Sequence, residues 1–176
     1  GMNDFTAIDK VSEIFLASGT EHAFLHTTNL YPTPPSLVRL GALTELMARY
    51  DVPIGLSDHT TNNLACLGAV ALGASVIEKH FTLSKELKGP DYAVSIEPDE
   101  MKNLVIGAKK IFLSSGDKKT IHIAEKLTRN WAYHSIVSKK NIKKGDILSR
   151  SNITIKRPGG GIPAREFNNI LGTKYM

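Results

Sequence analysis

Residues 74–81 read ASVIEKHF, a short β-branched run that ends directly in three ionisable residues. Residues 75–77 favour a buried strand, yet Glu78, Lys79 and His80 follow at once. Burying an unpaired charge is costly, so ionisable groups at the end of an apolar strand need partners or a chemical role. The stretch therefore predicts a strand whose carboxyl end carries functional groups.

The same pattern occurs in two earlier segments, HTTNLYP (26–32) and GLSDHT (55–60), which follow or end apolar runs. Alternate residues of a strand face the same side. Each predicted strand therefore brings polar groups to its carboxyl end. The residues that share a face are Glu78 with His80, Ser57 with His59, and Asn29 with Tyr31.

Helical and strand patterns alternate over the first 115 residues, which predicts an α/β fold with a parallel sheet and crossover helices. Apolar spacing typical of helices covers 6–18, 37–50, 62–73 and 98–112, and strand patterns cover 22–29, 52–57 and the segment from 75 onward.

The composition becomes polar after this region, and residues 116–130 are predicted to form a linker. Residues 131–176 contain short β-branched runs between turn residues such as Lys-Gly-Asp and a triple glycine. This pattern predicts a small β-rich module.

The composition excludes several classes of protein. No apolar run approaches the ~20 residues of a membrane span, and no signal-peptide pattern begins the chain. The single cysteine, Cys66, lies in an apolar stretch, and we expect it in the core of a cytoplasmic protein. The net charge of +5 has no accompanying nucleic-acid motif, so a solvated basic face is favoured over nucleic-acid binding or a membrane partner.

Two of the strand-end residues are candidate metal ligands. In parallel α/β folds the carboxyl ends of strands form the active site, and His59 and His80 would come from neighbouring strands. Taken singly, each histidine is more often a hydrogen-bonded structural residue. Their shared location, each near an acidic residue, instead favours one divalent cation with positions open for water and substrate.

Five motifs in series are similar to those of the sialic acid synthases, that is, bacterial-type N-acetylneuraminate synthases. They are LHTTNLYPTP (25–34), GLSDHT (55–60), VIEKHFT (76–82), GPDYAVS (89–95) and KRPGGGI (156–162). The resemblance implies the last three strands of a TIM-type (β/α)8 barrel with their helices in 1–115, followed by an incomplete SAF (antifreeze-like) domain in 131–176.

The resemblance also implies an activity, the condensation of phosphoenolpyruvate with N-acetylmannosamine to give N-acetylneuraminate and phosphate. It implies a divalent cofactor, Mn²⁺ with Mg²⁺ or Co²⁺ as alternatives, held by His59 and His80. Glu78 and Asp91 would bind sugar hydroxyls with Tyr31 nearby, Glu78 being the catalytic candidate, and Ser57 and Asn29 would hold phosphoenolpyruvate. Arg157 would reach the sugar of a partner subunit.

The residues alone leave alternatives open. Asp91 in GPD also suits an ordinary turn, and Arg157 alone would be a surface charge. Three strands cannot close a barrel, so we expect a larger assembly, either a homodimer or a complex with a complementary N-terminal half. A synthase for a related nonulosonic acid of the legionaminic type, and a non-catalytic split-gene or decayed remnant, are the rival functions.

Overall fold

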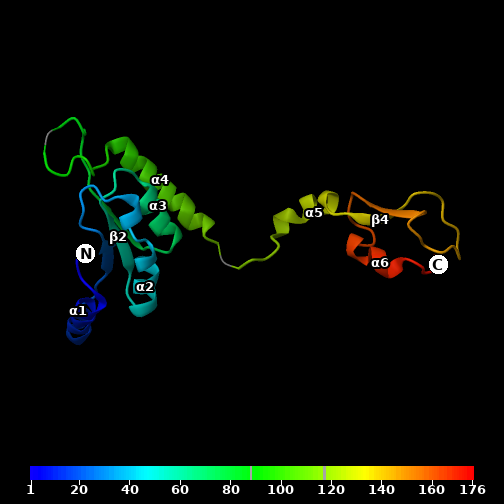
Figure 1. Ribbon diagram of the computed structural model, residues 1–176, viewed down its shortest axis with the longest axis horizontal. Helices are drawn as coiled ribbons and strands as arrows, with labels where there is room; N and C mark the ends of the chain where they lie inside the picture. The colour runs from blue at the N-terminus through cyan, green and yellow to red at the C-terminus, as the bar shows by residue number, and fades with distance from the viewer. Residues whose placement is uncertain (88, 117) are drawn as a thin grey trace. The chain divides into compact units, whose positions relative to one another are not determined.

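The computed structural model describes residues 1–87, 89–116 and 118–176, and the chain divides into two compact units, Gly1–Asp117 and Lys118–Met176 (Figure 1). Each unit is described by itself. Within the described residues, no helix is long and apolar enough to cross a membrane.

The first unit alternates helices and strands in the predicted order. Its sheet is parallel, with the strand order β1-β2-β3, which confirms the predicted α/β class for this unit. Its elements are α1 (Phe5–Ser18), β1 (Phe24–Thr27), η1 (Pro35–Leu37), α2 (Gly41–Arg49), β2 (Ile54–Asp58), α3 (Leu64–Ala71), β3 (Val76–Lys79) and α4 (Pro98–Ser114).

Local chemistry fixes the ends of the longest helices. The Asp4 carboxylate accepts a hydrogen bond from the Ala7 N–H and caps the start of α1. Gly19 ends this helix in the left-handed conformation, with φ of 66°, which a glycine adopts without steric cost. Glu97 and Glu100 form a reciprocal capping box at the start of α4.

The helix predicted over 37–50 is shorter in the structure. Arg39 adopts a left-handed backbone conformation, with φ of 54°, and so separates η1 from α2. A helix cannot continue through such a residue. The predicted periodicity is therefore present, but the regular helix begins only at Gly41.

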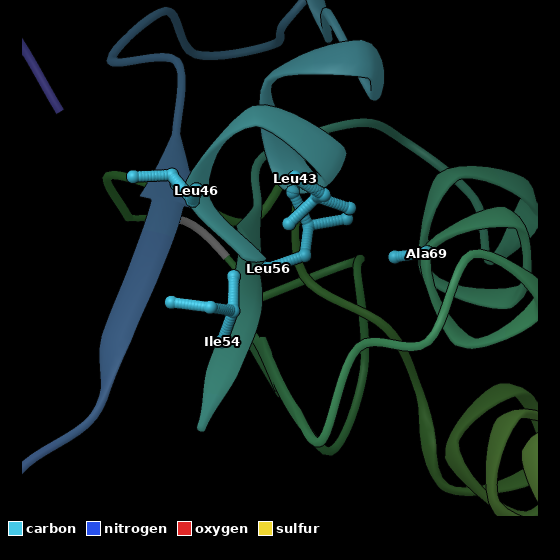
Figure 2. Packing of buried hydrophobic residues seen from close by; sticks show 5 residues of the cluster. All are labelled: Leu43, Leu46, Ile54, Leu56 and Ala69. Atoms are coloured by element: carbon cyan, nitrogen blue, oxygen red, sulfur yellow. The ribbon is translucent and has the colours of Figure 1, made fainter. Parts of the chain in front are cut away.

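The core of the first unit lies on one face of the sheet. Leu43 and Leu46 of α2 pack with Ile54 and Leu56 of β2 and Ala69 of α3 (Figure 2). Burying such a leucine or isoleucine side chain contributes about 1.5–3 kcal/mol. Because Ile54 and Leu56 point toward the helices, Ser57 between Leu56 and Asp58 must point to the opposite face.

The second unit contains a two-stranded antiparallel sheet between short helices, consistent with the predicted β-rich module. Its elements are η2 (Ile123–Glu125), α5 (Lys126–Ala132), β4 (Ser135–Ser138), β5 (Ile153–Lys156), η3 (Ala164–Glu166) and α6 (Phe167–Ile170). The stretch 116–130, predicted as a linker, thus includes η2 and most of α5. The helical turns there are short and largely solvent-exposed, so they leave little apolar periodicity in the sequence.

Candidate functional site

The carboxyl ends of β2 and β3 carry two neighbouring side-chain pairs that face opposite sides of the sheet. Ser57 is registered with Glu78, and Asp58 with Lys79. The Ser57 hydroxyl donates to the Glu78 carboxylate at 2.7 Å on the face away from the core helices. This bond orients an exposed carboxylate at the strand end, where the sequence predicts the site.

His59 and His80 directly follow these pairs, and the structure brings their rings together. The ring centroids are 5.2 Å apart, with an angle of 75° between the ring planes. His59 is buried, at 5% exposure, whereas the side chain of His80 is 33% exposed. Because metal–imidazole bonds are about 2.0–2.1 Å long, a separation of this size fits two rings that bind one ion.

The hydrogen bonding of His59 also fits metal binding. Its Nδ1 lies 3.0 Å from the backbone carbonyl of Thr28, so Nδ1 carries the proton and donates it to this carbonyl. The Nε2 lone pair is then available to a cation. Metal-binding histidines commonly have their second nitrogen fixed in this way.

Asp91 is close to His80 and also forms a turn. Its carboxylate lies 3.8 Å from Nδ1 of His80, too far for a hydrogen bond. Its backbone is left-handed, with φ of 65°, and its carbonyl accepts hydrogen bonds from the N–H groups of Val94 and Ser95. The backbone of Asp91 therefore forms the turn that was the alternative prediction, while its side chain lies near His80.

Tyr31 forms one wall beside the histidines. Its ring stacks on His59, with centroids 4.1 Å apart and an angle of 25°, and meets the edge of His80 at 5.7 Å. Asn29 is exposed in the same loop, two residues after β1. The predicted residues of the first unit thus lie on strand ends and the loops that follow them.

Arg157 belongs to the second unit, where it directly follows β5. It is exposed, and its guanidinium lies over the Trp131 ring at 5.6 Å from the centroid. Its predicted role toward a sugar stays a prediction.

The sequence reasoning missed a charged network on the other face of the same strand ends. Lys79 Nζ lies 2.7 Å from the Asp58 carboxylate, and the two side chains are 1% and 2% exposed. The Thr60 N–H and hydroxyl both donate to the same carboxylate, and Lys79 donates to the Thr60 carbonyl. The strand parity that groups Ser57 with His59 also places Asp58 and Lys79 on the opposite face, and this signal could have revealed the pair.

The buried network holds its charges in place. Burial raises the pKa of the Asp58 carboxyl, but hydrogen bonds from Lys79 and Thr60 outweigh this effect, and its pKa lies below the usual value. Cys66 donates to Asp58 at 3.3 Å, and burial together with the adjacent carboxylate raises the pKa of its thiol to about 12. Cys66 is completely buried, which confirms its predicted place in the core.

The arrangement suits a cation held mainly by two imidazoles. In the described parts of the chain, no group of three or more histidine, cysteine or acidic side chains converges as a metal site would. A cation at His59 and His80 would therefore keep open positions for oxygen ligands from water or substrate. Neutral imidazole binds both Mn²⁺-type and Zn²⁺ ions, so these two residues fit a divalent metal ion of either kind.

Comparisons with known proteins identify two sequence families in the chain. The NeuB family profile matches residues 1–120, and the SAF domain profile matches residues 133–175. The second match covers the β-rich module.

Two of the similar proteins are named as synthases. An N,N'-diacetyllegionaminic acid synthase of Campylobacter jejuni is 40% identical over 98% of this chain and 53% of its own length. The human N-acetylneuraminate-9-phosphate synthase is 32% identical over 100% of this chain and 50% of its own. The chain thus spans about half the length of these relatives.

A solved structure is similar as well. The N-acetylneuraminic acid synthetase of Leptospira borgpetersenii, crystallised with citrate, superposes with a TM-score of 0.69 at 32% identity. The superposition covers 73% of this chain and 45% of that protein.

Proposed function

Since this chain belongs to the NeuB family and carries a SAF domain, we propose that it forms the metal- and sugar-binding side of a nonulosonic acid synthase. The reaction is the condensation of phosphoenolpyruvate with an N-acetylated amino sugar. The approach of His59 to His80, at 5.2 Å between ring centroids, is the observation that carries this proposal.

The chemistry needs an activated aldehyde. His59 and His80 would hold a divalent cation of the Mn²⁺ type, which would supply Lewis-acid polarisation of the open-chain sugar's carbonyl. The enol carbon of phosphoenolpyruvate forms a bond to the aldehyde carbon, whose oxygen takes up a proton and becomes a hydroxyl. Water adds to the former enol ether carbon and loses its protons as phosphate leaves by carbon–oxygen cleavage, which leaves a keto group.

The surrounding side chains bind and orient the two substrates. Glu78 accepts hydrogen bonds from sugar hydroxyls, and the hydroxyl of Ser57 keeps its carboxylate in one orientation. Asp91 binds a further hydroxyl, and Tyr31 shields one side of the histidines. Asn29 and Ser57 contribute to binding phosphoenolpyruvate. Arg157 would recognise the N-acetylated substituent of the sugar in the site of a partner subunit.

The fold requires more strands than the three of this sheet. An eight-stranded barrel closes around its polar residues, whereas an open three-stranded sheet leaves two unpaired edges. We therefore propose that β1, β2 and β3 are the last strands of a barrel that a preceding segment or a complementary chain completes, in a homodimeric assembly.

The sugar has two candidate identities. N-acetylmannosamine would give N-acetylneuraminate, and a diacetylated amino sugar would give a legionaminic-type acid. This chain is 40% identical to an N,N'-diacetyllegionaminic acid synthase and 32% identical to the human N-acetylneuraminate-9-phosphate synthase. The difference favours the second candidate, so both sugars are tested.

The test is phosphate release from phosphoenolpyruvate with either sugar in the presence of Mn²⁺. The chain is assayed together with a polypeptide that supplies the first half of the barrel. We expect metal-dependent release with one sugar, and loss of release in His59→Gln and His80→Gln. A complex that forms and binds Mn²⁺ but releases no phosphate with either sugar would contradict the proposed reaction and support a non-catalytic role.

A further inference from the structure

The buried pair Asp58 and Lys79 lies directly beside the two histidines without belonging to the proposed binding surface. Asp58 precedes His59, and Lys79 precedes His80. Both side chains face the helix-covered side of the sheet, where Cys66 of α3 also contacts Asp58. The pair can therefore act on the histidines only through the backbone that it holds.

The contacts of Lys79 bracket His59. Its ammonium group binds the Asp58 carboxylate on one side of His59 and the Thr60 carbonyl on the other. A single side chain of β3 thus fixes the residues before and after His59. Because His80 directly follows Lys79 in the chain, this cross-link connects the two strand ends that carry the histidines.

The backbone alone does not keep the two strand ends together beyond this point. The His59 carbonyl accepts from the N–H of Thr33, and the His80 carbonyl accepts from the N–H of Ile96. Each strand end therefore turns to a different loop directly after the registered pair of Asp58 and Lys79.

Stability alone gives no reason for an ion pair at this place. Replacing a buried ion pair by apolar side chains of similar size is often neutral or stabilising, because desolvating two charges offsets their attraction. An apolar pair makes no directional bonds. Charge-assisted hydrogen bonds are directional, so they specify the separation and orientation of the two strand ends.

From these contacts we propose that Asp58 and Lys79 are positioning residues that set the separation and orientation of His59 and His80. The proposal deepens the proposed function and rests on it for its purpose, although the geometric effect holds without a metal. Thr60 takes part through its hydroxyl, which donates to Asp58 at 2.8 Å.

The experiment replaces both charges at once, in Asp58→Leu with Lys79→Met, in the complete chain. We expect unfolding by urea close to that of the unsubstituted chain, because no charge is left unpaired. Two quantities are then measured: the nuclear Overhauser effect between the ring protons of His59 and His80 without metal, and the Kd for Mn²⁺. We expect the nuclear Overhauser effect to be lost. We expect the Kd to increase about 10- to 100-fold, as it does when residues that orient metal ligands are replaced.

The matched control removes an exposed ion pair of the same unit, in Asp9→Asn with Arg49→Met, and should change neither readout. An unchanged ring-to-ring signal in the folded double variant would overturn the proposal. If that variant does not fold, the test is made with Thr60→Val. We expect a weaker ring-to-ring signal in Thr60→Val, and an unchanged signal would contradict the proposal. Absence of Mn²⁺ binding in the unsubstituted chain would refute the metal site, while the metal-free signal still tests the positioning role.

Discussion

The ends of β2 and β3 carry two registered pairs, one residue apart, in opposite environments. Ser57 and Glu78 lie on the face away from the core helices, where the glutamate is exposed. Asp58 and Lys79 lie among the helices, with side chains 2% and 1% exposed. The exposed pair leaves a carboxylate oxygen able to bind a ligand, whereas the buried pair uses its charges on protein groups alone.

This difference shows how one short stretch of strand supports both chemistry and structure. Alternation of side chains sends neighbouring residues to opposite faces. A charge on the helix-covered face must be neutralised within the protein, since burial of an unpaired charge is strongly unfavourable. A charge on the other face can remain hydrated, so it needs no partner within the protein.

The largest expected effect comes from breaking the buried pair on one side only. Lys79→Met leaves the buried Asp58 carboxylate without its cation, and we expect a loss of about 3–5 kcal/mol in the free energy of unfolding. Urea denaturation of the two proteins at pH 7 measures the difference. A loss below about 1 kcal/mol would mean that water already reaches this carboxylate and that the two faces are not distinct.

A smaller effect is expected from the exposed pair. Ser57→Ala removes the hydrogen bond to Glu78, and we expect a loss of no more than about 0.5–1.5 kcal/mol in the free energy of unfolding, because water replaces the hydroxyl. The same denaturation assay provides the comparison. A loss as large as that of Lys79→Met would show that Ser57 and Glu78 serve stability rather than ligand binding.

The smallest effect is expected at the partly exposed ion pair of Arg49 and Asp9, which sharpens the contrast with the buried pair. Arg49 binds Asp9 through two hydrogen bonds, and these bonds, with one from Tyr50, lower the pKa of Asp9 from 3.8 to about 2. A carboxyl whose pKa is lowered by folding stabilises the protein above its unfolded pKa and loses that effect as the pH falls.

Asp9→Asn should therefore lower the Tm slightly at pH 5, and the difference from the unsubstituted protein should disappear as the pH falls from about 4 to about 2. Thermal unfolding followed by circular dichroism across this range measures it. A Tm difference that is the same at both ends of the range would exclude Asp9 as its source.

Sequence patterns predicted the order of helices and strands and the meeting of His59 with His80, because both depend on local periodicity and on strand parity. The register between β2 and β3 depends on residues some twenty positions apart, so the pairing of Asp58 with Lys79 was not predicted. The bond from His59 to the Thr28 carbonyl depends on a loop conformation, for which a single sequence gives no periodic signal. The break before α2 similarly depends on one left-handed residue, Arg39.

We propose that His59 and His80 bind one divalent ion together. The most direct measurement is a titration of the chain with Mn²⁺ below one equivalent, followed by the nuclear magnetic resonance signals of its six histidines. We predict that the ring signals of His59 and His80 broaden together at the lowest Mn²⁺ concentrations, while that of His22, before the start of β1, stays sharp. Broadening of only one of the two, or equal broadening of all the histidines, would contradict the shared site.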